Sequence, residues 1–236
     1  MRVLAIDTAT TALVTGVVDT ATGQTTERVL EGTRAHNELL IPTITEVLAE
    51  ASMEYSDLEA VVTGVGPGPF TGLRVGMATA SALADALSIP LHGICTHDAI
   101  AAAAELHLDP AAAADEATAL VATDARRKEI YWATYRATDS GVQRISGPAV
   151  TKPAELEVEL ASTAQVIIPD RLAEQLPEKL AALPHRAAHP TAAALVATAD
   201  LEAEPAPVVP LYLRRPDAVP PKQQQQLSAA IPKVEL

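Results

Sequence analysis

The glycines and prolines of TGVGPGPFTGLRVGMATA, residues 63–80, form the stretch of this chain that most resembles a binding motif. A glycine-rich loop at the start of a helix often holds a phosphate, because several backbone N–H groups can point at it. The spacing here matches neither GxGxxG nor GxxxxGK[ST]. Pro67 and Pro69 also lack the N–H that such a cradle needs. We therefore predict a stiff loop that leads into a helix and binds no phosphate.

Histidines and the cysteine are the other candidates for chemistry. His185 and His189 are spaced as HxxxH, but prolines bracket them, so we interpret the spacing as accidental and predict no metal site. Cys95 is the single cysteine, and we expect it to be a small core residue rather than a nucleophile. The side chains alone therefore indicate neither a metal nor a cofactor.

The balance of charge limits the classes of function. The chain has 17 basic and 30 acidic residues, a net charge of −13, whereas nucleic-acid binding by one chain needs a basic face. Arg126, Arg127 and Lys128 form either a local basic patch or a solvated turn before a strand. If the protein acts on RNA, we expect a partner to supply most of the RNA contacts. One cysteine and the absence of a long apolar run predict a cytoplasmic protein without a disulfide or a membrane span.

Hydrophobic periodicity predicts the same order of elements in each half of the chain. In the first half we expect strands at 3–7, 12–19, 25–32, 58–66 and 91–96, and helices at 36–51, 70–87 and 97–107. In the second half we expect strands at 117–125, 129–137, 142–150 and 164–170, and helices at 152–161, 171–183 and 191–201.

This order predicts an α/β fold of two tandem βββαβα lobes. It is the layout of the actin, hexokinase and heat-shock-70 ATPase-like (ribonuclease H-like) superfamily, in which a nucleotide lies between the halves. We expect an N-terminal lobe at 1–107, a degenerate C-terminal lobe at 108–204, a return segment at 205–215 and a flexible tail at 216–236.

Small residues recur every four positions along the helix at 70–87, at Gly72, Gly76, Ala80 and Ala84. Glycine inside a helix costs about 1 kcal/mol relative to alanine, so this ridge needs a structural reason. The ridge lets another element approach closely, either a helix or sheet of the same chain or a helix of a partner. Both interpretations remain open from the sequence.

Five segments together resemble the TsaB (formerly YeaZ) family of tRNA threonylcarbamoyladenosine biosynthesis proteins. They are VLAIDTATTALVTGVV, RAHNELLIPTITEVL, DLEAVVTGVGPGPFTGLRVGMATASALA, VATDARRKEIYWATY and VPLYLRRPDA, in order over residues 1–216. The signature loop of the family corresponds to Gly66, Pro67, Gly68, Phe70, Thr71, Gly72 and Arg74. Pro69 stands where the family more often has serine, which should change the stiffness of the loop rather than the function.

The resemblance implies a non-catalytic dimerization subunit that pairs with TsaD, the family's catalytic relative, in a complex that also contains the ATPase TsaE. The complex places the threonylcarbamoyl group on N6 of adenosine 37 in tRNAs that read codons beginning with A. This chain would contact tRNA only indirectly, and it would form a homodimer when TsaD is absent. The implied partner interface comprises Leu40, Ile44, Val47, Leu48, Phe70, Leu73, Gly76, Met77 and Ala80.

Catalytic equipment of the relatives is replaced in this chain. The metal-binding HxxxH histidines of TsaD fall at about Thr96 and Ile100. Asp124 stands where working superfamily members carry a glycine-rich phosphate turn. Asp7 occupies the position of an ATPase aspartate, or it caps the first hairpin. No catalytic, metal or cofactor residue is therefore expected.

Two alternatives to the scaffold remain. One is an independent sugar-kinase-like ATPase or glycoprotease-like enzyme, and the other is a regulatory half-site for a nucleotide at the joint with TsaD. The scaffold hypothesis predicts that Gly76→Arg abolishes pairing with TsaD while the isolated chain stays folded, because the ridge would lie in the interface.

Overall fold

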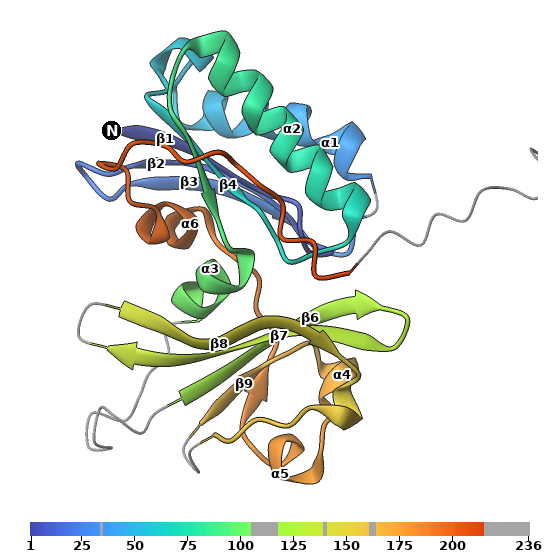
Figure 1. Cartoon of the computed structure of the whole chain (residues 1–236). Coiled ribbons are helices and arrows are strands. Elements are labelled where there is room, and N and C mark those ends of the chain that lie inside the picture. The colour runs from blue at the N-terminus through green and yellow to red at the C-terminus, as the bar shows by residue number, and fades with distance from the viewer. Residues whose placement is uncertain (34, 105–117, 139–140, 161–163, 215–236) are drawn as a thin grey trace, which may run out of the picture.

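The computed structural model describes residues 1–33, 35–104, 118–138, 141–160 and 164–214. Its first half contains β1 (Arg2–Asp7), β2 (Leu13–Asp19), β3 (Thr25–Leu30), α1 (His36–Glu50), a 3-10 turn (Tyr55–Asp57), β4 (Ala60–Gly64), α2 (Phe70–Leu87), β5 (Leu91–Ile94) and α3 (Thr96–Ala103). The five strands form one mixed sheet in the order β3-β2-β1-β4-β5 (Figure 1). In it β1 runs antiparallel to β2 and parallel to β4.

The second half repeats this plan. It contains β6 (Thr118–Arg126), β7 (Glu129–Thr138), β8 (Gly141–Thr151), a 3-10 turn (Pro153–Glu155), β9 (Gln165–Ile167), α4 (Asp170–Ala173), α5 (Glu178–Ala181), β10 (His185–Arg186) and α6 (Ala192–Thr198). Its sheet has the order β10-β9-β6-β7-β8, with β6 antiparallel to β7 and parallel to β9. The predicted fold class, α/β with two tandem lobes, is confirmed.

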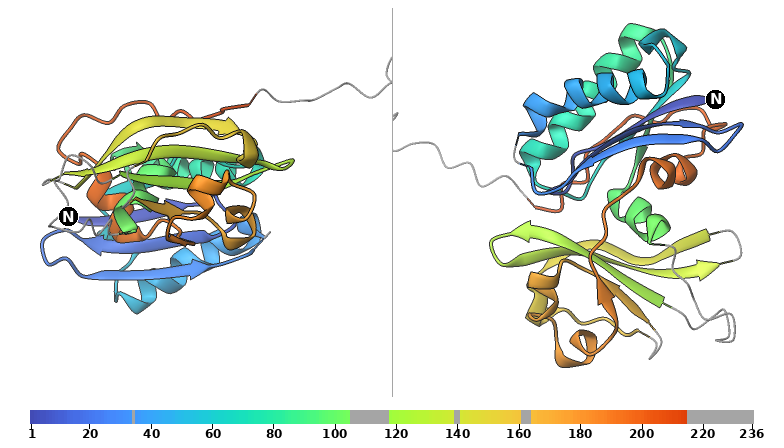
Figure 2. Two further views of the ribbon diagram at one scale, coloured as in Figure 1. Left: turned by 90° about the horizontal axis from the view of Figure 1, so that it is seen from below. Right: turned by 180° about the vertical axis from the view of Figure 1, so that it is seen from behind.

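The first sheet is covered on both faces, which explains why its central strands are apolar throughout. Alternate residues of β1 point to opposite sides. Leu4 and Ile6 pack in the cluster that includes α1 and α2, whereas Val3 and Ala5 pack with Leu195 of α6. Figures 1 and 2 show α1 and α2 on the outer side of this sheet, with α3 and α6 on the side that faces the second sheet.

α6 joins the two halves. It lies in the part of the chain that the element order assigns to the second lobe, yet its core contacts are with the first sheet. The chain then continues along the first lobe, where the Leu211 N–H donates to the Val65 carbonyl at 2.8 Å. The last described residues therefore lie beside α2 and the loop that precedes it.

The helix predicted at 152–161 is wrong within its described part. Residues 152–160 form only the turn Pro153–Glu155 and an extended segment. Leu156, Val158 and Leu160 are two residues apart and all pack on the core of the second lobe. A helix would place Val158 on the face opposite to Leu156 and Leu160, so packing all three on the core excludes the helix.

One further helix prediction in this region needs correction, and one short strand was not predicted. The helix expected at 171–183 is split into α4 and α5, because Pro177 at the N-terminus of α5 has no N–H to continue the first helix. The residues around His185 form the short strand β10, paired parallel with β9. Two residues are too few for a periodicity to predict.

Candidate functional site

A buried hydrogen-bond network holds the signature loop. Asp7, at the end of β1, accepts from the Thr96 hydroxyl at 2.6 Å and from the Ala9 N–H at 2.9 Å. The Thr96 hydroxyl oxygen in turn accepts from the Gly66 N–H at 3.2 Å, and the Thr96 N–H donates to the Gly66 carbonyl at 2.7 Å. Burial raises the pKa of Asp7 to about 6, although the Thr96 and Ala9 hydrogen bonds oppose that shift. Asp7 thus joins the first hairpin to the loop.

The loop needs glycine because it lies against other backbone. Gly66 has φ of +93°, a conformation that L side chains rarely adopt. A Cβ on Gly68 would lie 2.0 Å from the Ala9 carbonyl oxygen. Since the Gly66 N–H is already donated to Thr96, it is not available to a phosphate. The loop therefore acts as a packed joint between β4, α2 and the first hairpin.

The small-residue ridge of α2 faces its own sheet. The Thr8 hydroxyl donates to the Gly72 carbonyl at 2.7 Å and accepts from the Gly76 N–H at 2.9 Å. A Cβ on Gly76 would lie 2.4 Å from the Thr8 hydroxyl oxygen, and Ala80 and Ala84 belong to the same buried cluster as β1. The close approach is intramolecular, so the interpretation of the ridge as a partner-facing stripe is wrong.

Burial also corrects the implied interface. Leu40, Ile44, Val47, Leu48, Leu73, Gly76 and Ala80 are buried within the first lobe, so a partner cannot contact them directly. Phe70 is 44% exposed and Met77 is half-buried, so these two can contribute to a surface. Most residues that the resemblance implied for the interface lie on the inner stripes of α1 and α2. On helices this apolar, the sequence does not show which side the sheet covers.

The outer side of α2 carries an aromatic cluster instead. Phe70 stacks on Tyr212, with ring centroids 5.3 Å apart. The Arg74 guanidinium lies 3.7 Å from the Phe70 ring centroid and donates through Nε to the Tyr212 hydroxyl at 2.7 Å. These three residues form what we call the α2 cluster. Phe70 and Tyr212 are 142 positions apart, and no local pattern in the sequence could have paired them.

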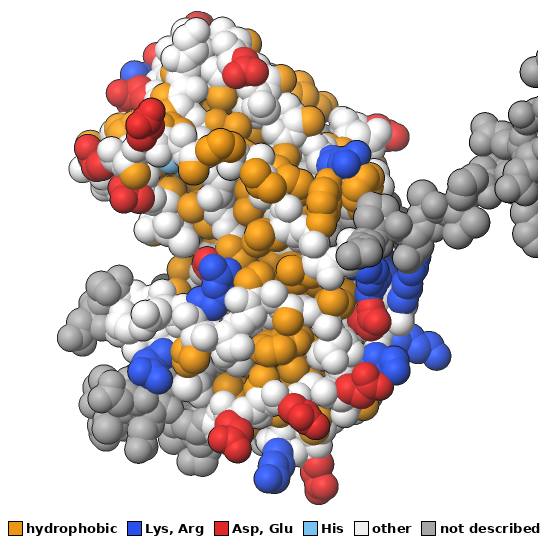
Figure 3. All heavy atoms as spheres, in the orientation of Figure 1, with side chains coloured by type: hydrophobic (Ala, Val, Ile, Leu, Met, Phe, Trp, Pro, Cys, Tyr) orange, Lys and Arg blue, Asp and Glu red, His pale blue; other side chains and the backbone are white. Residues whose placement is uncertain are grey.

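A shallow groove continues from the α2 cluster along the helix. It has a volume of about 370 Å³ and is lined by Arg74, Met77, Ala78, Ser81, Val208, Pro210 and Tyr212. Val209, next to it in the chain, is 64% exposed. Figure 3 shows apolar side chains spread over this side of the first lobe. Exposed aromatic and aliphatic side chains gathered in one place are typical of a protein-binding surface.

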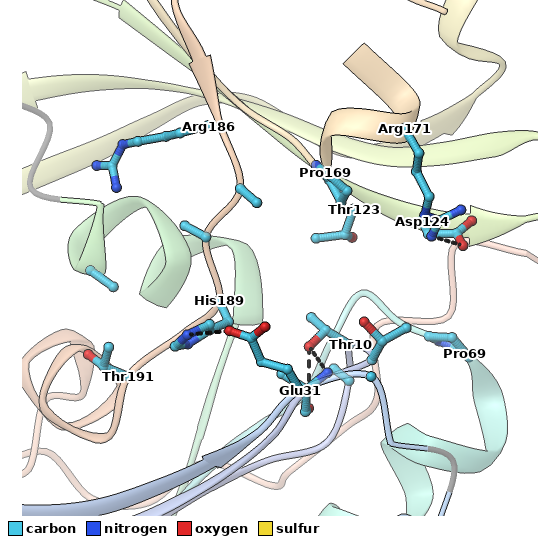
Figure 4. A pocket seen from close by; sticks show the side chains of 17 residues that line it. Thr10, Glu31, Pro69, Thr123, Asp124, Pro169, Arg171, Arg186, His189 and Thr191 are labelled. Atoms are coloured by element: carbon cyan, nitrogen blue, oxygen red, sulfur yellow. Dashed lines mark hydrogen bonds and ion pairs between the residues drawn. The ribbon is translucent and has the colours of Figure 1, made fainter. Parts of the chain in front are cut away.

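A second cavity, of about 440 Å³, lies between the two lobes and is lined by residues of both. Figure 4 shows Thr10 of the first lobe and Asp124 of the second on opposite sides of it. Asp124 accepts from Arg171 at 2.6 Å and from the Arg126 N–H at 2.7 Å. Although partial burial raises the pKa of Asp124, Arg171 and the Arg126 N–H hold it below its usual range.

This cavity offers a carboxylate where a phosphate turn would offer N–H groups. The Arg126 N–H at this turn is already used by Asp124. On the other side of the cavity, His189 Nε2 lies 3.6 Å from Glu31 Oε1. His185 is exposed on β10, whereas His189 follows the strand and faces Glu31, so the HxxxH pair is not on a helix.

Thr96 and Ile100, the positions at which the resemblance to TsaD would place metal ligands, have structural roles in this chain. Thr96 binds Asp7, and Ile100 packs in the core between α3 and the second sheet. His97 Nε2 lies 2.9 Å from the Thr123 hydroxyl, and burial lowers the pKa of His97 to about 3, so its ring is neutral. Cys95 is buried, which confirms the predicted core residue, and this burial raises the pKa of its thiol to about 11. Among the described residues, no group of three or more His, Cys, Asp or Glu is placed to hold a metal.

Known proteins resemble this chain both in sequence and in fold. The model of the family described as TsaD, tRNA N6-adenosine threonylcarbamoyltransferase, matches residues 30–196. The tRNA threonylcarbamoyladenosine biosynthesis protein TsaB of Escherichia coli is 33% identical over 143 residues, which are 60% of this chain and 58% of that protein. The solved structure of YeaZ from Pseudomonas aeruginosa covers 90% of this chain with a TM-score of 0.74 and 25% identity, and 99% of that chain is covered. The chain belongs to the family whose model matches residues 30–196, in the TsaB/YeaZ branch of that family.

An uncharacterised protein of Mycobacterium leprae is 46% identical over 225 residues, 92% of this chain, and the chain spans 56% of its length. The TsaD-type family match fits the fold that the TsaB and TsaD proteins share. Within the described residues, no helix has the length and apolarity needed to cross a membrane.

Proposed function

We propose that this chain is the non-catalytic subunit that pairs with a TsaD-type protein in threonylcarbamoyladenosine synthesis on tRNA. Membership of the TsaB/YeaZ family supports the general role in this tRNA modification. The observation that carries the pairing is the outer side of α2, where Phe70, the adjoining groove and Tyr212 of the segment beside the helix are exposed. In the proposed complex, TsaE joins the pair, and a second copy of the chain covers the same side when TsaD is absent.

The cleft between the lobes supports a scaffold rather than an independent kinase. Its second-lobe turn presents Asp124, which would repel a phosphate, and the cation closest to that carboxylate, Arg171, is already paired with it. An independent sugar-kinase-like or glycoprotease-like enzyme is the competing proposal. ATP hydrolysis or stoichiometric zinc binding by the purified chain alone, at enzyme-like rates or ratios, would favour that competitor.

The pairing is tested by Ala78→Arg, because Ala78 is exposed and lines the groove on α2. We expect this variant to stay folded and to bind a TsaD-type partner at least about 10-fold more weakly, since a charged side chain would be desolvated in the interface. Ala154→Arg is the matched control, because Ala154 is exposed on the second lobe. Isothermal titration with the partner measures both variants, and equal affinities would contradict this placement of the interface.

A further inference from the structure

The turn of the β6–β7 hairpin is formed by basic side chains, although the chain as a whole is acidic. Arg126 pairs with Glu129 across the hairpin, so Arg127 and Lys128 form the two-residue connection. All three cations are exposed. The whole chain carries a net charge of −13, so three consecutive cations at one protruding tip are a local feature rather than the average composition.

The backbone of this turn is unfavourable for the residues that form it. Arg126, Arg127 and Lys128 have φ of 63°, 53° and 63°. A two-residue hairpin with positive φ at both central positions strongly favours Asn-Gly, since long side chains are strained there. The turn therefore keeps two cations where a more stable pair would fit, which indicates that the cations serve something other than folding.

Two carboxylates near this tip are already engaged by other cations. Glu129 is paired with Arg214, and Asp124 is paired with Arg171. The turn itself places three consecutive cations at the exposed tip of the hairpin. Figure 3 shows Lys and Arg side chains gathered at this edge of the molecule, on the right of the view.

The return segment holds the hairpin next to the proposed partner surface. Tyr212 belongs to the α2 cluster, and Arg214, two residues later, donates to the Ala125 carbonyl and pairs with Glu129. The cationic tip therefore adjoins the surface that we propose binds a TsaD-type protein. A polyanion held by that partner would pass within reach of the hairpin.

We infer that the tip of the β6–β7 hairpin, Arg126 to Lys128, is a contact for the phosphate backbone of the tRNA substrate. The tip protrudes and is cationic, so it suits the repeated phosphates of a chain and reads no bases. The inference rests on the proposed function, and it goes beyond the expectation that the chain meets tRNA only through its partner.

The test uses the complex of the full chain with a TsaD-type partner and an unmodified tRNA transcript that reads a codon beginning with A. The variant is Arg127→Asn/Lys128→Gly, which installs the favoured turn pair and removes two cations. The control is Arg28→Gln/Lys179→Gln, which removes two cations away from the hairpin. Filter binding at several salt concentrations gives the affinity, and thermal unfolding gives the stability.

We expect the hairpin variant to melt at the same or a higher temperature than the wild type, yet to bind tRNA about 10- to 100-fold more weakly. Its slope of log affinity against log salt should fall by about 2, because each cation that is removed neutralises about one phosphate in the wild-type complex. The control should keep the wild-type slope. A merely structural turn would move stability and affinity in the same direction.

An intact complex whose tRNA affinity is the same with both variants would overturn this inference and leave the proposed function standing. Failure of the wild-type chain to join the TsaD-type partner would overturn the proposed function and, with it, the inference. Loss of binding to phosphatidylserine vesicles without loss of tRNA binding would show a membrane contact and contradict the RNA assignment.

Discussion

The first hairpin of each lobe contains the same aspartate turn, but this turn is buried in the first lobe and partly exposed in the second. In both, an aspartate near the end of the first strand accepts the N–H two residues later, Asp7 from Ala9 at 2.9 Å and Asp124 from Arg126 at 2.7 Å. Asp7 is fully buried and contacts Thr96, whereas Asp124 faces the cleft and pairs with Arg171. One local motif therefore becomes a joint in the core of the first lobe and a charged turn at the surface of the second.

What differs is the packing around each hairpin. The first hairpin is covered by α2, which approaches closely because Gly72 and Gly76 leave room for Thr8. The tip of the second hairpin is exposed to solvent at Arg126, Arg127 and Lys128. The comparison shows that the surroundings, not the turn motif, decide whether the pKa of the aspartate is raised, as in Asp7, or lowered, as in Asp124.

The largest expected effect comes from Gly76→Arg, which disrupts the packing of α2 on the first hairpin. The new side chain has no space between α2 and Thr8, so we expect a loss of at least about 4 kcal/mol of unfolding free energy, enough to prevent stable folding. The packing thus corrects the prediction, made from the sequence, of a folded chain that cannot pair. Circular dichroism during heating measures the loss, with Ala78→Arg on the outer side of the same helix as the control. A Gly76→Arg variant as stable as that control would contradict the packing described above.

The second prediction concerns Asp7→Asn, which tests whether burial raises the pKa of Asp7 in the first hairpin. Burial raises the pKa of Asp7 from 3.8 to about 6, so the folded state favours the protonated carboxyl. Its stabilising contribution is complete below pH 3.8 and is lost as the pH rises to about 6. At pH 7.5 the substitution should therefore raise the unfolding free energy, by up to about 3 kcal/mol.

At pH 4 the same substitution should change little, because Asp7 is then mostly protonated in the folded protein. Urea denaturation between pH 4 and pH 8 measures the difference. A stability difference between Asp7→Asn and wild type that is independent of pH would contradict the raised pKa of Asp7.

The smallest effect is expected for Asp124→Asn in the second hairpin. Arg171 and the Arg126 N–H hold the pKa of Asp124 below 3.8, so its contribution is present above that value and is lost as the pH falls through the folded pKa. We expect a loss of about 1 kcal/mol at pH 7, the scale of a partly exposed ion pair. A double-mutant cycle with Arg171→Gln measures the coupling, and additive losses would contradict the pair.

The order of elements was predictable because it depends on local periodicity. The short apolar run in β1 and the apolar repeat in α1 were sufficient to place both. The segment at 156–160 was not, since Leu156, Val158 and Leu160 fit a strand-like period while the surrounding glutamates and alanines favour a helix. Packing on the second core decided that segment.

The candidate site was predictable in part. The motif itself identified Phe70 and Arg74 as members of the signature loop, and both lie at the exposed start of α2. It did not show which side of α2 the sheet covers. Leu73, Gly76 and Ala80 were therefore assigned to the interface, although they are buried against the sheet. α2 is small or apolar on nearly every side, so its amphipathic pattern carries too little information to orient it.

The sequence by itself determined the family, the two repeated lobes and the stiff glycine-proline loop, because each depends on residue types at short range. Only the tertiary structure decided that Tyr212 stacks on Phe70, that Arg214 reaches Glu129, and that Thr8 fills the space above Gly76. These pairs are far apart in the chain, and their contacts arise from how the sheets and helices pack. That packing leaves the outer side of α2 and the tip of the second hairpin adjoining each other at the surface.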